Sequence, residues 1–152
     1  MSAVARLEAL GLEIPAVLPS VGRYAATAVV GELLFVAGHT ARTAAGPGLA
    51  GRVGVEVSME QAAAEAARAA LNLLAAAHAT VGLDRVVAVV QLRGYVRSDT
   101  DFTQHPSVID GASELLAKVF PDAAPHTRAA IGVSSLPGGA CVELEAVLRI
   151  GS

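Results

Sequence analysis

A run of apolar residues near the middle of the chain constrains the fold more than any other segment. Residues 85–92 read Arg-Val-Val-Ala-Val-Val-Gln-Leu, a stretch rich in β-branched side chains with little alternation between apolar and polar positions. This pattern predicts a β-strand that is apolar on both faces. Such a strand must be covered on both faces of its sheet.

Two amphipathic helices flank this strand in the sequence. The first follows Ser58, which forms a capping-box spacing with Gln61, and it ends at Gly82. Its polar stripe holds Gln61, Glu65, Arg68 and Asn72. The second begins near Pro106, a residue that suits the first helical position. Two helices cover only one face of a sheet of this size, so we expect another copy of the chain to cover the other face.

Strand-like segments lie at both ends of the chain. Residues 24–30 and 33–37 predict a β-hairpin around Gly31-Glu32. Residues 128–134 and 141–150 predict a second hairpin around Pro137-Gly138-Gly139. We expect one domain over residues 1–152, in which residues 1–20 are an N-terminal extension. The predicted class is α+β, with a mostly antiparallel mixed sheet and both helices on one face.

Composition excludes several function classes. The net charge is −3 and aromatic residues make up 3% of the chain, which argues against a nucleic-acid or anionic-membrane partner. No apolar stretch is long and clean enough to span a membrane, and a single cysteine fits a reducing, cytoplasmic location. We expect neither a metal nor a cofactor, because phosphate-loop and dinucleotide motifs are absent and the four histidines are scattered singly. Cys141 is interpreted as a packing residue.

The segment from Pro125 to Glu145 carries the residues that suggest chemistry. Arg128 begins one predicted strand, and Glu143 lies on the neighbouring strand of the predicted hairpin. A guanidinium group holds a carboxylate through two parallel hydrogen bonds, and a nearby glutamate can serve as a base. A purely structural Arg–Glu pair across two strands is the alternative, and the residues alone leave both open.

The same segment resembles the C-terminal signature of the YjgF/RidA family. Arg128 is followed eight residues later by Leu136-Pro137, then by a small-residue turn and Val-Glu-Leu-Glu-Ala at 142–146. Further resemblance lies in Gly22-Arg23-Tyr24, in Phe35-Val36-Ala37-Gly38 and in Asp110-Gly111-Ala112-Ser113, the last typical of a longer branch of the family. The resemblance covers about residues 20–150.

This resemblance implies a chorismate-mutase-like fold and a homotrimer with a cleft at each subunit interface. It also implies hydrolysis of reactive 2-imino and 2-enamino acids to 2-keto acids and ammonia without a cofactor. Arg128 would bind the carboxylate of a small substrate, and Tyr24 would close the pocket from another subunit. Gly38 would let the backbone approach the carboxylate, and Glu143 would hold and polarise the attacking water.

Three further positions of the implied substrate site depart from the family pattern. Ala130 stands where many members have Cys, and no step of the implied reaction needs a thiol. Asp110 stands at a position that is often Asn, and it would repel an anionic substrate unless it is paired. His39 replaces a frequent Gln. These departures leave the natural substrate open.

Two other functions are weighed against the deaminase. One is a non-catalytic trimer that binds small carboxylate metabolites through Arg128. The other is the endoribonuclease activity attached to part of the family, which ranks last because the acidic chain offers no patch that would neutralise phosphates. Chorismate mutase activity is an analogy of fold alone.

Overall fold

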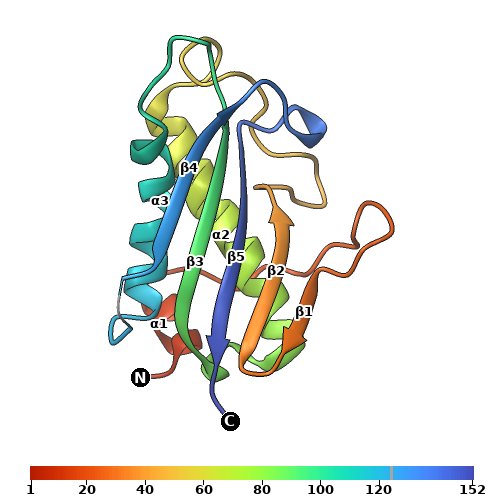
Figure 1. Cartoon of the computed structure of the whole chain (residues 1–152), viewed down its shortest axis with the longest axis vertical. Helices are drawn as coiled ribbons and strands as arrows, with labels where there is room; N and C mark the ends of the chain where they lie inside the picture. The colour runs from red at the N-terminus through yellow and green to blue at the C-terminus, as the bar shows by residue number, and fades with distance from the viewer. Residues whose placement is uncertain (124) are drawn as a thin grey trace.

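The computed structural model describes residues 1–123 and 125–152 and has a five-stranded sheet at its centre (Figure 1). The strands lie in the order β1-β2-β5-β3-β4, and all neighbours are antiparallel except the parallel pair β3–β4. The α+β class and the mixed sheet are as predicted. The strands are β1 Thr27–Val30, β2 Leu33–His39, β3 Val86–Arg97, β4 Thr127–Val133 and β5 Val142–Ile150. The helices are α1 Ala3–Ala9, α2 Met59–Val81 and α3 His105–Val119, with short 3₁₀ turns η1 Leu83–Arg85 and η2 Pro137–Gly139.

The C-terminal hairpin predicted from residues 128–150 is wrong. β3 lies between β4 and β5, so these two strands are not neighbours. β3 is the longest strand and pairs along both of its edges, which places the two-faced apolar segment inside the sheet. α3 provides the crossover that lets β4 run parallel to β3. The Pro137-Gly138-Gly139 segment forms η2 rather than a tight hairpin turn.

α2 and α3 cover one face of the sheet, behind the strands in Figure 1. The predicted capping box of α2 is present, because Ser58 Oγ accepts from the Gln61 amide and the Gln61 side chain accepts from the Ser58 amide. The two helices are in close contact at Gly111, where a methyl group would overlap the carbonyl oxygen of Ala63. α3 is amphipathic, as predicted, and its apolar face is buried: Val108, Ile109, Ala112, Leu115, Leu116 and Val119.

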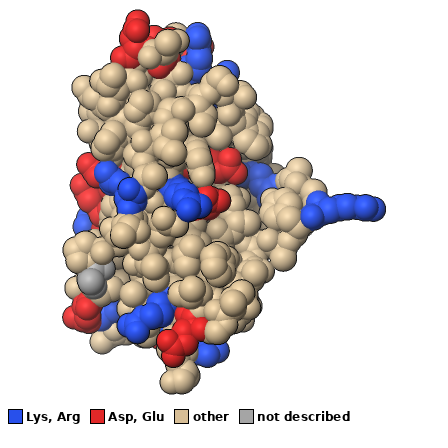
Figure 2. Space-filling view, viewed as in Figure 1, with Lys and Arg blue, Asp and Glu red and all other residues tan. Residues whose placement is uncertain are grey.

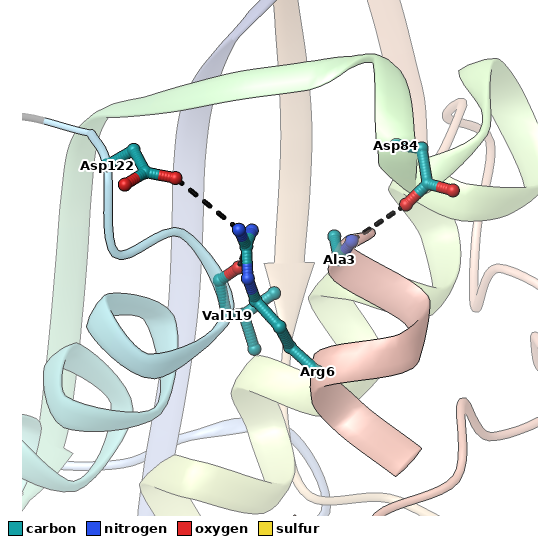
Figure 3. A network of polar contacts seen from close by, with 5 residues as sticks. All are labelled: Ala3, Arg6, Asp84, Val119 and Asp122. Atoms are coloured by element: carbon teal, nitrogen blue, oxygen red, sulfur yellow. Dashed lines mark hydrogen bonds and ion pairs between the residues drawn. The ribbon is translucent and has the colours of Figure 1, made fainter. Parts of the chain in front are cut away.

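The N-terminal helix α1 is tied to the ends of two later elements (Figure 3). The amide of Ala3 donates to Asp84 of η1 at 2.8 Å. Arg6 Nη1 donates to the carbonyl oxygen of Val119 at 3.2 Å, where α3 ends, and Arg6 Nη2 lies 3.4 Å from Asp122. A cation at the carboxyl end of a helix satisfies a free carbonyl and opposes the negative end of the helix dipole.

The other face of the sheet is open in the single chain, as the two-faced strand predicts. Large apolar side chains of four strands are exposed on it, among them Phe35 at 42%, Val90 at 40% and Ile131 at 48%. In Figure 2 large uncharged areas of this face lie between a band of charged side chains across the middle and charged groups at the two ends. Within the described ranges, no helix is long and apolar enough to cross a membrane.

Candidate functional site

A pocket of about 580 Å³ lies where β2 ends beside β5. It contains four of the residues predicted for the site, namely Tyr24, Gly38, His39 and Glu143. Tyr24 comes from the segment before β1, which projects from the body of the molecule at the right of Figure 1, and its side chain is half exposed. The pocket therefore combines an exposed aromatic side chain, a close backbone approach, an imidazole and a carboxyl group. We call it the Glu143 pocket.

Gly38 leaves room for the carboxyl group of Glu143. A Cβ atom at this position would lie 2.5 Å from Oε1 of Glu143 and 3.1 Å from its carboxyl carbon. Real Cβ atoms do not approach other heavy atoms this closely, so any side chain at position 38 would displace the glutamate. The predicted role of Gly38 was a close approach to substrate, and the structure adds a close approach to Glu143.

The Glu143 carboxyl is only partly solvated. Burial raises its pKa, and the negative charge of Glu145 raises it further. Glu145 accepts hydrogen bonds from Tyr95 Oη at 2.8 Å and Arg93 Nη1 at 3.1 Å, and it lies on the same face of β5 as Glu143. A carboxyl with a raised pKa takes up a proton more readily than an ordinary surface glutamate, which suits a group that exchanges protons with a ligand.

His39 has a defined tautomer. Its Nδ1 lies 2.7 Å from the carbonyl oxygen of Ala37, so Nδ1 carries the hydrogen and Nε2 keeps its lone pair in the neutral ring. Burial lowers the pKa of His39, the hydrogen bond to Ala37 opposes this, and the charge of Arg42 lowers the pKa further. The neutral ring adds a hydrogen-bond acceptor to the Glu143 pocket.

Two polar residues of α2 hold the segment that forms one wall of this pocket. Asn72 Nδ2 donates to the carbonyl oxygens of Thr40 and Arg42, each at 2.8 Å. Glu65 is 5% exposed, accepts from the amide of Leu49 at 2.9 Å and pairs with Arg68. The periodicity places both residues on the polar stripe of α2, but sequence reasoning missed that this stripe fixes a wall of the pocket. The sequence signal that could have indicated this role is the recurrence of polar residues along an otherwise alanine-rich helix.

Arg128 lies elsewhere, next to α3. Its Nη1 donates to Asp110 Oδ1 at 2.7 Å and to Ser113 Oγ at 3.1 Å. Asp110 is therefore paired with Arg128, which offsets the repulsion of an anionic substrate that an unpaired Asp110 would cause. Among the described residues, Nη2 and Nε of Arg128 have no hydrogen-bond partner. That edge of the guanidinium is available to a ligand.

Arg128 and Glu143 do not meet within one chain. Arg128 pairs with Leu92, whose side chain is buried toward the helices, whereas Glu143 alternates with the buried Val142 and Leu144 and faces the other way. β3 also separates their strands. The predicted contact between neighbouring hairpin strands, whether functional or structural, is therefore wrong. The paired strands instead join Glu145 to Arg93.

The remaining predictions for the site concern Ala130, Cys141 and a metal ion. Ala130 pairs with Gly94 and packs against the core, and it lines neither the Glu143 pocket nor the pocket beside Arg128. Cys141 is buried, and burial together with the charge of Glu65 raises its pKa to about 11, which agrees with a packing role. Residues 1–123 and 125–152 contain no group of three His, Cys, Asp or Glu side chains placed to hold a metal ion.

Comparisons with known proteins point to one family. Residues 4–144 match the family described as "YjgF/chorismate_mutase-like, putative endoribonuclease". Protein TCP17 of Trypanosoma cruzi is 33% identical over 150 residues, which are 97% of this chain and 94% of that protein.

Two solved structures superpose over nearly the whole chain. A protein of unknown function from Agrobacterium tumefaciens, Atu1372, is 33% identical with a TM-score of 0.90, covering 98% of this chain and 92% of its own. A protein from Shewanella oneidensis titled "putative endoribonuclease" is 26% identical with a TM-score of 0.93, covering 99% and 100%. These similarities extend over all the elements that form the two sites.

Proposed function

Because the chain belongs to the YjgF/chorismate-mutase-like family, we propose that it hydrolyses reactive 2-imino and 2-enamino acids to 2-keto acids and ammonia. The proposal depends on two groups that lie apart in one copy of the chain: a partly desolvated Glu143 carboxyl and an open guanidinium edge on Arg128. Glu143 can act as a general base that activates water, and Arg128 can bind a carboxylate through two hydrogen bonds.

The proposed site is built from two copies of the chain. Arg128 and the Glu143 pocket lie on opposite faces of one sheet, so a substrate cannot touch both within one copy. In a homotrimer whose open faces pack against one another, the β4 edge of one copy, which carries Arg128, would have to lie against the Glu143 pocket of the next. The exposed apolar side chains of that face and the projecting Tyr24 support such an assembly.

The chemistry follows from positioning. The free edge of Arg128 holds the substrate carboxylate and thereby fixes the adjacent C=N carbon. A water on Glu143 attacks that carbon as the carboxylate takes one of its protons, and the C=N electron pair moves to nitrogen. The same carboxyl then returns the proton to nitrogen, which completes the carbinolamine. The carboxylate next carries the hydroxyl proton to the amino group, the C–N bond breaks as the C=O bond forms, and ammonia leaves. His39 Nε2 is a hydrogen-bond acceptor for these intermediates.

The test is release of 2-keto acid from imino acids generated in the assay by an amino acid oxidase. We expect a rate above the spontaneous hydrolysis, and in Glu143→Gln a loss of roughly 10²-fold or more with 2-keto acid binding retained. If the wild-type chain binds 2-keto acids through Arg128 but adds nothing to the spontaneous rate, it is a carboxylate-binding protein and the deaminase proposal fails.

A further inference from the structure

A second pocket, of about 360 Å³, lies directly beside Arg128. Its walls come from the C-terminal half of α3, from β3 and from the segment that leads into β4. Most of the lining is apolar, including Val89, Leu116, Ala117, Phe120 and Pro121. Nothing in the proposed hydrolysis uses this space. We call it the Arg128 pocket.

Two polar residues of the Arg128 pocket are in direct contact. Arg128 and Ser113 both line it, and Ser113 Oγ accepts from Arg128 Nη1 at 3.1 Å. Asp110 holds the same Nη1 from outside the lining, so the guanidinium has a fixed orientation. The Arg128 side chain is 23% exposed, which keeps its free edge accessible while its stem is packed. His126 is the other titratable group among the lining residues.

A cation beside an apolar cavity selects molecules with matching chemistry. A carboxylate on Arg128 places whatever it carries within reach of the apolar walls. A small acid such as pyruvate leaves those walls in contact with water, and a charged side chain is desolvated there without a partner. A branched aliphatic or aromatic side chain buries its surface instead, and each buried methylene group strengthens binding roughly fourfold.

We propose that the Arg128 pocket receives the side chain of the substrate, so that the enzyme acts on imino acids derived from branched-chain and aromatic amino acids. This inference rests on the proposed function for the reaction, and only the preference for large apolar acids rests on the pocket itself. Arg128 is then both the carboxylate ligand and the border between the reacting carbon and the side-chain pocket.

The test is calorimetric titration of the full chain with pyruvate, 4-methyl-2-oxopentanoate and phenylpyruvate, the stable 2-keto products. We expect the two larger acids to bind at least tenfold more tightly than pyruvate. Ala117→Leu fills the pocket from an exposed position of α3 and should reduce this ratio to about threefold or less. Ala64→Leu makes the same change at an exposed position of α2 outside the pocket and should keep the wild-type ratio.

Each outcome bears on a different claim. Equal affinity for small and large acids, no binding of any acid, or an Ala117→Leu ratio equal to that of the wild type would overturn the side-chain pocket. A preserved preference for large acids without any keto-acid release would refute the deaminase and leave the pocket standing. Turnover without a size preference would refute the side-chain pocket and leave the deaminase standing.

Discussion

At the scale of single residues, burial and the charge of one neighbour together make Glu143 readier to take a proton. Burial is the main reason that the pKa of Glu143 is raised, and the negative charge of Glu145 adds to it. Glu145 also pairs with Arg93, so neutralising Glu145 leaves an unopposed cation on the same face. Both effects of that change stabilise the ionised form of Glu143.

We therefore expect Glu145→Gln to move the acid limb of the kcat/KM profile to lower pH. The base must be ionised to act, so activity falls as pH drops through the pKa of Glu143, and a lower pKa moves this fall toward acid. The plateau above the limb should stay close to that of the wild type. The measurement is the pH–rate profile, and Glu8→Gln on α1 is the charge-matched control. A limb that stays in place or moves to higher pH would show that Glu143 is not the titrating base.

Arg128 combines two tasks that a lysine cannot perform together. One nitrogen is bound to Asp110 and Ser113, and the opposite edge is left for the ligand. Arg128→Lys keeps the positive charge but loses this geometry, so we expect a loss on the order of 2–3 kcal/mol in ligand binding and in kcat/KM. Titration with a 2-keto acid measures the first, and steady-state rates measure the second. The control Arg149→Lys changes an exposed arginine on β5. An Arg128→Lys protein that binds and turns over like the wild type would mean that the arginine is structural.

At the scale of elements, the helices were predictable because their signals are local. Capping at Ser58, the proline at the start of α3 and the helical spacing of apolar residues each depend on a few neighbouring positions, and the structure confirms all three. The C-terminal strands were also predicted, but their pairing was not. Which strand lies beside which depends on burial across the whole sheet, and a Pro-Gly-Gly turn carries no information about a strand inserted between its two arms.

In the candidate site, too, residues in local motifs were predictable from the sequence, whereas contacts between distant segments were not. The residues Tyr24, Gly38, His39 and Glu143 share a pocket within one chain, whereas the family resemblance implies that Tyr24 closes the site from another subunit. Asn72 and Glu65 escaped prediction because their partners are backbone groups 16–32 residues away in sequence. The Arg128 pocket escaped because its walls come from three separate elements.

Gly111 gives a test of the packing between α2 and α3. Gly-to-Ala changes inside helices ordinarily stabilise, but here the new methyl group meets the Ala63 carbonyl oxygen, part of a helix backbone that cannot step aside alone. We expect Gly111→Ala to lower the free energy of unfolding by about 1–3 kcal/mol, the usual cost of overpacking. Urea denaturation at matched protein concentration measures this loss. Ser107→Ala at an exposed position of α3 should change it by less than about 0.5 kcal/mol, and a Gly111→Ala protein as stable as the wild type would disprove the close contact.

At the scale of the whole molecule, the open sheet face and the two separated half-sites have a common explanation. Both are incomplete in one copy, and the proposed assembly of three copies would complete both. We expect light scattering at micromolar concentration to give a mass of three times 15.3 kDa. A monomer under these conditions would leave the open face without a partner and would remove the basis for a shared site.

Mixed trimers test the shared site most directly. Arg128→Lys and Glu143→Gln, each nearly inactive alone, are unfolded together in equal amounts and refolded, and keto-acid release is measured against the two separately refolded variants and refolded wild type. If Arg128 of one copy serves Glu143 of the next, random mixing gives an intact pair at about one quarter of the sites, and about one quarter of the wild-type activity should return. If the mixture is no more active than the separate variants although refolded wild-type trimers are fully active, the site does not span two copies and the proposed intersubunit site is wrong.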